Sequence, residues 1–171
     1  MIKQNDHSSS NSSELFKAIL IAWLIAGTLD ISSAIISFSI NTGQNILGLF
    51  QYIASGFFGN SAFNGGVPMA LAGLLFHYLF AFIWTVFFFW IFPKIKLQSL
   101  NKFLAGFLYG MFVWVVMNLI VVRLSRTPKF HPSTGHIIAN MLYLIFFIGT
   151  PISLFANRYY SKRIHNLASG I

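Results

Sequence analysis

The residue of this chain with the most distinctive chemistry is Asp30, an acidic residue inside a long apolar stretch. An ionised carboxylate in a membrane-spanning helix costs about 2.5–3.5 kcal/mol on insertion scales, so it needs a partner, water or a proton. Alanines at helical spacing share its side of the predicted helix, which lets another helix approach closely. We therefore expect Asp30 to face the interior of a helical bundle and not lipid.

His77 has the same setting in the next apolar stretch, where small residues again share its predicted helix face. Counted along their stretches, Asp30 and His77 lie at about the same depth, roughly 15 Å from the same end of the bundle. Successive antiparallel helices are usually neighbours. We therefore predict that the two side chains lie in direct contact or are joined by one water.

Further polar residues lie near the same end of the later apolar stretches. Asn118 and Asn140 lie about 6 Å below the predicted outer surface, and Arg123 and His136 mark the rim. The outer half of the bundle is thus predicted to collect Asp30, His77, Asn118, Arg123, His136 and Asn140. Such a polar pocket can bind or pass a small solute or proton, or its members can simply hold the helices together by hydrogen bonds.

Several other chemistries lack the residues that they need. The chain has no cysteine, which excludes disulfides, thiolate zinc sites and iron–sulfur clusters. No glutamate lies deep in an apolar stretch, so the Glu-x-x-His di-iron pattern is absent. His131 and His136 straddle a turn and form only a weak metal pattern. We assign no metal, no cofactor and no catalytic residue, and an enzyme acting on a lipid or envelope substrate is the third alternative.

The elements that must position these residues are strongly apolar. Of the 171 residues, 56% are hydrophobic and only 8% are charged, whereas a soluble domain carries about 25% charged residues. This deficit predicts an integral membrane protein built from helices, because the period-two alternation of a barrel is absent. The net charge is +8, but the basic residues lie at the ends of apolar stretches, so we expect no nucleic-acid partner and a lipid bilayer instead.

The apolar stretches predict an all-α integral membrane four-helix bundle. The expected spans are about 15–40, 68–92, 103–122 and 136–156, each about long enough to cross roughly 30 Å of hydrocarbon. Residues 1–14 are rich in serine and asparagine and are expected to form a disordered cytoplasmic tail. We expect 15–160 to be the transmembrane domain and 161–171 to be a second cytoplasmic tail.

The connection between the first two spans is predicted to contain a helix of its own. Apolar residues recur at helical spacing from Ile46 to Phe57, with glycine and polar residues on another face. This pattern is typical of a short amphipathic helix. The helix is too short to span and is expected to lie at the outer interface or to enter the bilayer as a re-entrant segment. It either gates the polar pocket or only covers the helix ends.

The basic residues indicate the orientation of the spans. With the N-terminus inside, eight Lys and Arg residues flank the cytoplasmic side and three flank the outer side. The connection from Asn41 to Val67 has no charged residue and is then outside. The positive-inside rule therefore favours both termini in the cytoplasm.

Two local patterns concern the third and fourth spans. Gly106 and Gly110 form a G-x-x-x-G pattern, which favours close packing within the chain and has a contact between copies, a homo-oligomer, as its alternative. Thr150 and Pro151 predict a kink in the fourth span.

Four short segments carry a resemblance to known sequences: Ala-Gly-Thr-Leu-Asp at 26–30, Gln-Tyr-Ile-Ala-Ser-Gly at 51–56, Gly-Leu-Leu-Phe-His at 73–77, and Tyr109-Gly110. Through them, and over about 15–160, the chain resembles a family of uncharacterised bacterial four-span inner-membrane proteins. The resemblance implies a bacterial inner-membrane protein. It implies no activity, because none is established for that family.

Overall fold

The computed structural model describes residues 3–43, 45–128 and 133–168. These residues form helices and short connections, with no strand among them. Four helical stretches are long and apolar enough to cross a membrane: Ser12–Thr42, Gly66–Ile91, Lys102–Leu124 and Thr134–Ile164. They coincide with the four predicted spans, so the predicted all-α membrane bundle is confirmed.

The first span belongs to helix α1 (Lys3–Thr42). This helix continues through Lys3 to Ser13, which we expected to be disordered, while the first two residues lie outside the described part of the chain. The physical reason is that no proline or glycine interrupts this polar segment, so it can extend the helix that the apolar span establishes.

The predicted helix between the first two spans is present as α2 (Ile46–Phe58), followed by the 3-10 segment η1 (Gly59–Asn64). Asn45 caps α2, because its side-chain oxygen accepts a hydrogen bond from the Leu47 backbone at 3.2 Å.

The remaining helices complete the other three spans. The third and the fourth span each pass through a π-helical segment, η3 and η4. The elements are α3 (Gly66–Ile91), the 3-10 segment η2 (Leu97–Ser99), α4 (Lys102–Val115), η3 (Val116–Val121), α5 (Val122–Leu124), α6 (Thr134–Tyr143), η4 (Leu144–Gly149) and α7 (Thr150–Ala168).

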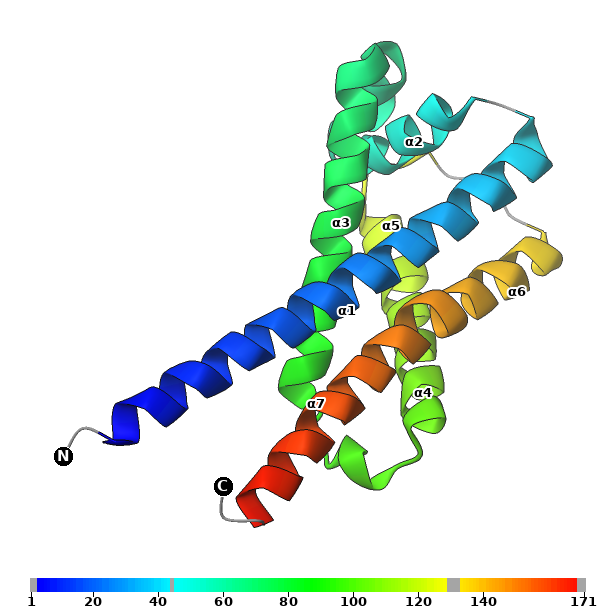
Figure 1. Ribbon diagram of the computed structural model, residues 1–171. Helices are drawn as coiled ribbons and strands as arrows, with labels where there is room; N and C mark the ends of the chain where they lie inside the picture. The colour runs from blue at the N-terminus through cyan, green and yellow to red at the C-terminus, as the bar shows by residue number, and fades with distance from the viewer. Residues whose placement is uncertain (1–2, 44, 129–132, 169–171) are drawn as a thin grey trace.

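Helix α2 packs along α3 rather than across the ends of the spans (Figure 1). Gly73 of α3 makes this possible, because a Cβ there would lie only 1.9 Å from the Phe50 carbonyl oxygen of α2. Farther along, the Phe57 and Phe76 rings stack with centroids 4.2 Å apart. Since Phe76 lies about 15 Å along α3 from Gly66, α2 reaches at least that far along the second span. Whether it lies at the interface or is re-entrant stays a prediction.

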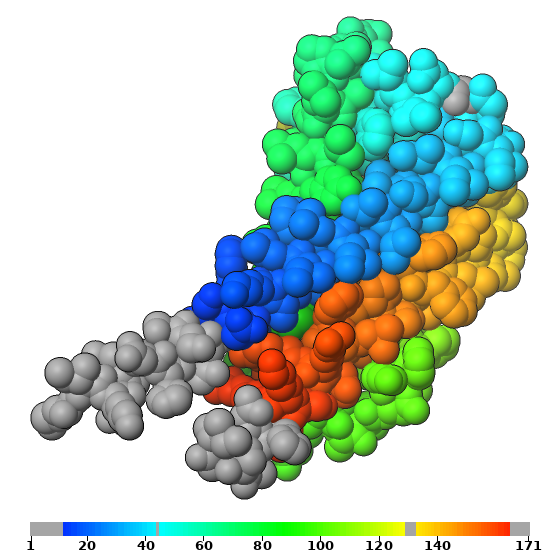
Figure 2. All heavy atoms as spheres, viewed as in Figure 1, coloured from blue at the N-terminus to red at the C-terminus, as the bar shows by residue number. Residues whose placement is uncertain are grey.

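The four spans form two crossing pairs. Helix α1 runs beside the fourth span, and both cross in front of α3 and the third span (Figure 1). Side chains close the seam between α1 and the fourth span (Figure 2). The start of α1 and the end of α7 lie at one end of the bundle, which we name the inner end after its predicted orientation. The opposite end, with Thr42, Gly66 and Leu124, is the outer end.

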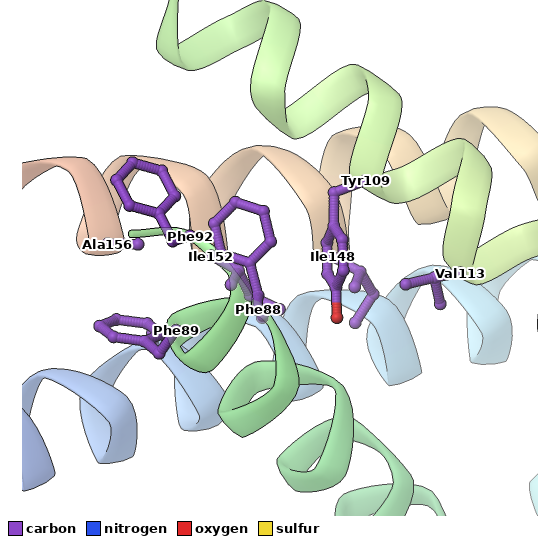
Figure 3. Close-up of a cluster of buried hydrophobic side chains, with 10 residues drawn as sticks. Phe88, Phe89, Phe92, Tyr109, Val113, Ile148, Ile152 and Ala156 are labelled. Atoms are coloured by element: carbon purple, nitrogen blue, oxygen red, sulfur yellow. The ribbon is translucent and has the colours of Figure 1, made fainter. Parts of the chain in front are cut away.

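One buried hydrophobic cluster occupies the inner half of the bundle. The side chains of Phe88, Phe89 and Phe92, at the end of α3, meet residues from the other three spans (Figure 3). The remaining members of this inner core are Ala22, Ala26, Tyr109, Val113, Ile148, Ile152 and Ala156. All are nearly or completely buried, so dispersion contacts at close packing hold this half together.

Gly106 and Gly110 pack inside the chain, as the favoured reading of their pattern predicts. A Cβ at Gly110 would lie 2.5 Å from the Ile145 Cα, and one at Gly149 would lie 2.1 Å from the Gly106 carbonyl oxygen. The absence of side chains thus lets the third span approach the fourth at backbone distance. A contact between copies through these glycines would have to displace the fourth span.

A kink was predicted at Thr150 and Pro151. The irregularity that the structure has next to them is the π segment η4, which ends at Gly149. Proline has no N–H to continue the ladder. The Thr150 hydroxyl instead donates a hydrogen bond to the Ile145 carbonyl at 3.0 Å, so a backbone acceptor near the interruption is satisfied.

Candidate functional site

His77 lies half-buried in the middle of α3 and faces α1, as predicted. Its Nε2 lies 2.9 Å from the Gly27 carbonyl oxygen. A carbonyl can only accept, so Nε2 carries the proton in this hydrogen bond. Gly27 allows the close approach, because a Cβ there would already lie 3.2 Å from the Tyr78 ring. His77 therefore joins the second span to the backbone of the first.

Two further hydrogen bonds strengthen the same crossing, and the sequence analysis did not identify them. The Trp23 indole N–H donates to the Tyr78 carbonyl at 2.8 Å, and the hydroxyls of Thr28 and Tyr78 lie 3.0 Å apart. Trp23 shares a helix face with Gly27 and Asp30, so an indole N–H on the predicted bundle face was an available signal. Together these contacts fix how α1 and α3 cross.

Asp30 lies one helical turn beyond Gly27 and is half-buried. Its backbone carbonyl accepts a hydrogen bond from the Ser33 hydroxyl at 2.8 Å. Within the described part of the chain, the Asp30 carboxylate itself has no hydrogen bond or ion pair. The ion pair described there joins Lys17 to Glu14 at 3.3 Å, at the exposed start of the first span.

The predicted direct contact between Asp30 and His77 is therefore absent. His77 reaches the right helix but binds a backbone carbonyl one turn away from the carboxylate. The depth estimate carried an error of about one turn, and it considered side chains only. A single water between the two side chains stays a prediction.

Asn118 and Asn140 meet, as their matching depths indicated. The Asn118 side-chain amide donates to the Asn140 side-chain oxygen at 3.3 Å and to the Trp114 carbonyl at 3.0 Å. Asn118 lies in the π segment η3 and Asn140 in α6, so this pair links the third and fourth spans. Asn118 is half-buried and Asn140 is exposed at the bundle surface.

The two rim residues stand apart from these contacts. His136 is exposed in the first turn of α6, where its Nδ1 lies 2.6 Å from the Ser133 hydroxyl, the N-cap of that helix. Arg123 is exposed in α5, and its side chain has no hydrogen bond or ion pair among the described residues. The structure thus divides the six predicted residues among the α1–α3 crossing, the Asn118–Asn140 link and the rim.

The connection that follows α5 contacts α2, the helix that we predicted either to gate the polar pocket or to cover the helix ends. The Arg126 backbone N–H donates to the Gly56 carbonyl at 3.0 Å, and the hydroxyls of Ser125 and Thr127 lie 2.7 Å apart beside it. A Cβ at Gly56 would lie 3.5 Å from the Thr127 hydroxyl. Residues 125–127 therefore pack against α2 at the outer end.

Among the residues described, no group of three or more His, Asp or Glu side chains gathers where it could hold a metal ion. His131, half of the weak metal pattern, lies outside the described residues.

Two indole N–H groups, of Trp84 and Trp114, are buried with no acceptor in the described part of the chain. The Tyr109 hydroxyl donates to the Trp84 carbonyl and links α4 to α3.

The fold defines the class: an all-α, multi-pass membrane protein with four apolar helices. No protein-family model, no curated protein and no solved structure matches the chain. The resemblance to bacterial four-span proteins therefore stays a prediction, and any function has to be argued from the residues themselves.

Proposed function

We propose that the protein binds a proton or a small solute at Asp30 and exchanges it with the outer face of the membrane. One observation carries the proposal: a carboxylate inside a membrane-length helix has no hydrogen bond or ion pair in the described part of the chain. Such a group is expensive in a bilayer, and a proton, a bound cation or water has to offset its cost.

The surrounding contacts support this role. The neighbouring polar side chains already form hydrogen bonds within the protein, whereas the Asp30 carboxylate, which has none among the described residues, remains free to bind a ligand. His77 is engaged with Gly27 and Asn118 with Asn140. These hydrogen bonds join the helices around Asp30 but do not involve its carboxylate. Asp30 also lies about 18 Å along α1 from Thr42, so a ligand would have to reach it from the outer end.

Flux in proteoliposomes tests the proposal. Purified protein reconstituted with an imposed pH difference and an internal pH dye should give proton flux that Asp30→Asn abolishes, while the melting temperature in detergent stays within a few degrees. Glu14→Gln is the matched control, since it removes an exposed carboxylate from the same helix. Absence of flux in the unaltered protein would reject proton passage, and full flux in Asp30→Asn would reject Asp30 as the proton-binding group.

A structural or assembly role is the second candidate, and a specific observation favours it. Trp23, His77 and Asn118 each form a hydrogen bond to another helix, which is what polar residues do when they only hold a bundle together. In that case Asp30→Asn should lower the melting temperature in detergent, and no flux should be measurable in the unaltered protein.

We also propose that the protein lies in a bacterial inner membrane with both termini in the cytoplasm. Four spans bring the start of α1 and the end of α7 to one end of the bundle, and most basic residues flank that end. Reporter fusions after Ser99 and after Ser161 should report cytoplasm, and a fusion within 45–64 should report the outside. A cytoplasmic signal from 45–64 would overturn the orientation.

A further inference from the structure

Most basic residues of this chain have no acidic partner available, because eleven Lys and Arg residues face only three Asp and Glu residues. Only three acidic residues occur, and none follows Asp30. Glu14 is paired with Lys17. The lysines at the inner end of α3 and α4 are Lys94, Lys96 and Lys102, and no carboxylate lies within ion-pair distance of them in the described part of the chain. Their counter-charges are not supplied by the described part of the chain.

A shallow, open apolar groove runs along one face of α3 toward these lysines. Its walls are the side chains of Phe82, Ile83, Val86, Phe87 and Trp90. The groove is open to the side, since Ile83 is 48% and Trp90 56% exposed.

Aromatic contacts hold one wall of the groove in place. The Phe87 ring stacks on Phe112 of α4 at 5.9 Å and lies 6.0 Å from the Trp90 ring. This wall is therefore fixed by a second span and does not depend on α3 alone.

Lys94 closes the inner end of the groove. Its ammonium lies 3.5 Å from the centroid of the Trp90 ring, a cation–π contact that places the charge beside the last groove residue. Phe82 to Trp90 covers about 12 Å of helix, close to the roughly 15 Å hydrocarbon depth of one leaflet. The groove thus has a charged end and an apolar length that match one lipid molecule in one leaflet.

We propose that this groove and Lys94 bind one anionic phospholipid, with an acyl chain along Phe82, Val86 and Trp90 and the phosphate at the Lys94 ammonium. Apolar walls suit a hydrocarbon chain, and an ammonium without a nearby carboxylate suits a phosphate. The site lies on the opposite half of α3 from His77 and is independent of any role of Asp30.

Lipid retention measured by native mass spectrometry tests this site. Protein in detergent would be incubated with equal amounts of phosphatidylglycerol and phosphatidylcholine. Lys94→Gln should lower phosphatidylglycerol retention about fivefold, the effect expected of one lysine at an anionic surface, without changing phosphatidylcholine. Val86→Phe should lower retention by filling the groove. The matched controls are Lys162→Gln, an exposed charge on α7, and Leu71→Phe, an exposed site near the other end of α3.

Specific results would overturn the proposal. Equal retention of both lipids would show that the headgroup charge is not recognised. An equal loss in Lys94→Gln and Lys162→Gln would indicate general surface attraction. Unchanged retention in Val86→Phe would remove the groove from the site. A dimer that dissociates in Val86→Phe would identify a second copy of the chain as the occupant.

Discussion

The two halves of this bundle are held by different forces. In the inner half, Phe88, Phe89 and Ile152 are almost fully buried and touch side chains from every span (Figure 3). In the outer half, directional hydrogen bonds join the spans, among them those of Trp23, His77 and Asn118. Because lipid is as apolar as a core side chain, the inner half gains mainly from dispersion at close packing.

This difference separates stability from chemistry. Packing in the inner half is spread over many buried side chains from all four spans. The outer half leaves the Asp30 carboxylate without a hydrogen bond or ion pair among the described residues. Variants in the inner half should therefore change the melting temperature most, and variants in the outer half should change function with smaller losses of stability.

The largest expected effect comes from Phe88→Ala in the inner core. Phe88 has no exposed surface and its ring lies 4.4 Å from that of Tyr109. Emptying this volume should destabilise the protein by about 3–5 kcal/mol, which thermal unfolding in detergent would measure. Phe103→Ala is the matched control, since Phe103 is 57% exposed and its loss should cost under about 1 kcal/mol. Equal losses would contradict the role of buried packing in the inner half.

A smaller effect is expected at the Asn118–Asn140 link in the outer half. Interhelical hydrogen bonds in membrane proteins contribute about 0.6 kcal/mol on average in double-mutant cycles. The cycle Asn118→Leu, Asn140→Leu and the double variant should therefore give a coupling of roughly that size, far below the Phe88 effect. A coupling above about 2 kcal/mol would show that polar contacts carry the outer half as strongly as packing carries the inner half.

Some features of the fold and of the candidate site could be predicted from the sequence, and others could not. Span positions could be predicted because length and apolar composition are enough to define a membrane helix. The matching depths of Asn118 and Asn140 were predicted, but their hydrogen bond was not. The partner of His77 could not be predicted, because a backbone carbonyl such as that of Gly27 has no sequence signature. The π segments η3 and η4 could not be predicted either, since a single turn of i→i+5 hydrogen bonds within an α-helix is too short to show a hydrophobic period in the sequence.

The smallest expected effect is the coupling between Asp30 and His77. The His77 ring is held by the Gly27 carbonyl at 2.9 Å, and no hydrogen bond or ion pair joins the ring to the Asp30 carboxylate in the described chain. Groups that share no contact usually contribute additively within about 0.5 kcal/mol. Unfolding of Asp30→Asn, His77→Gln and the double variant should thus give costs that add. A coupling of 1 kcal/mol or more would mean that a water joins the two side chains, which would restore the one-water pair and assign His77 to the Asp30 site. Trp23→Phe combined with Asp30→Asn is the control, because Trp23 binds the same crossing through Tyr78 and should couple no more strongly than His77.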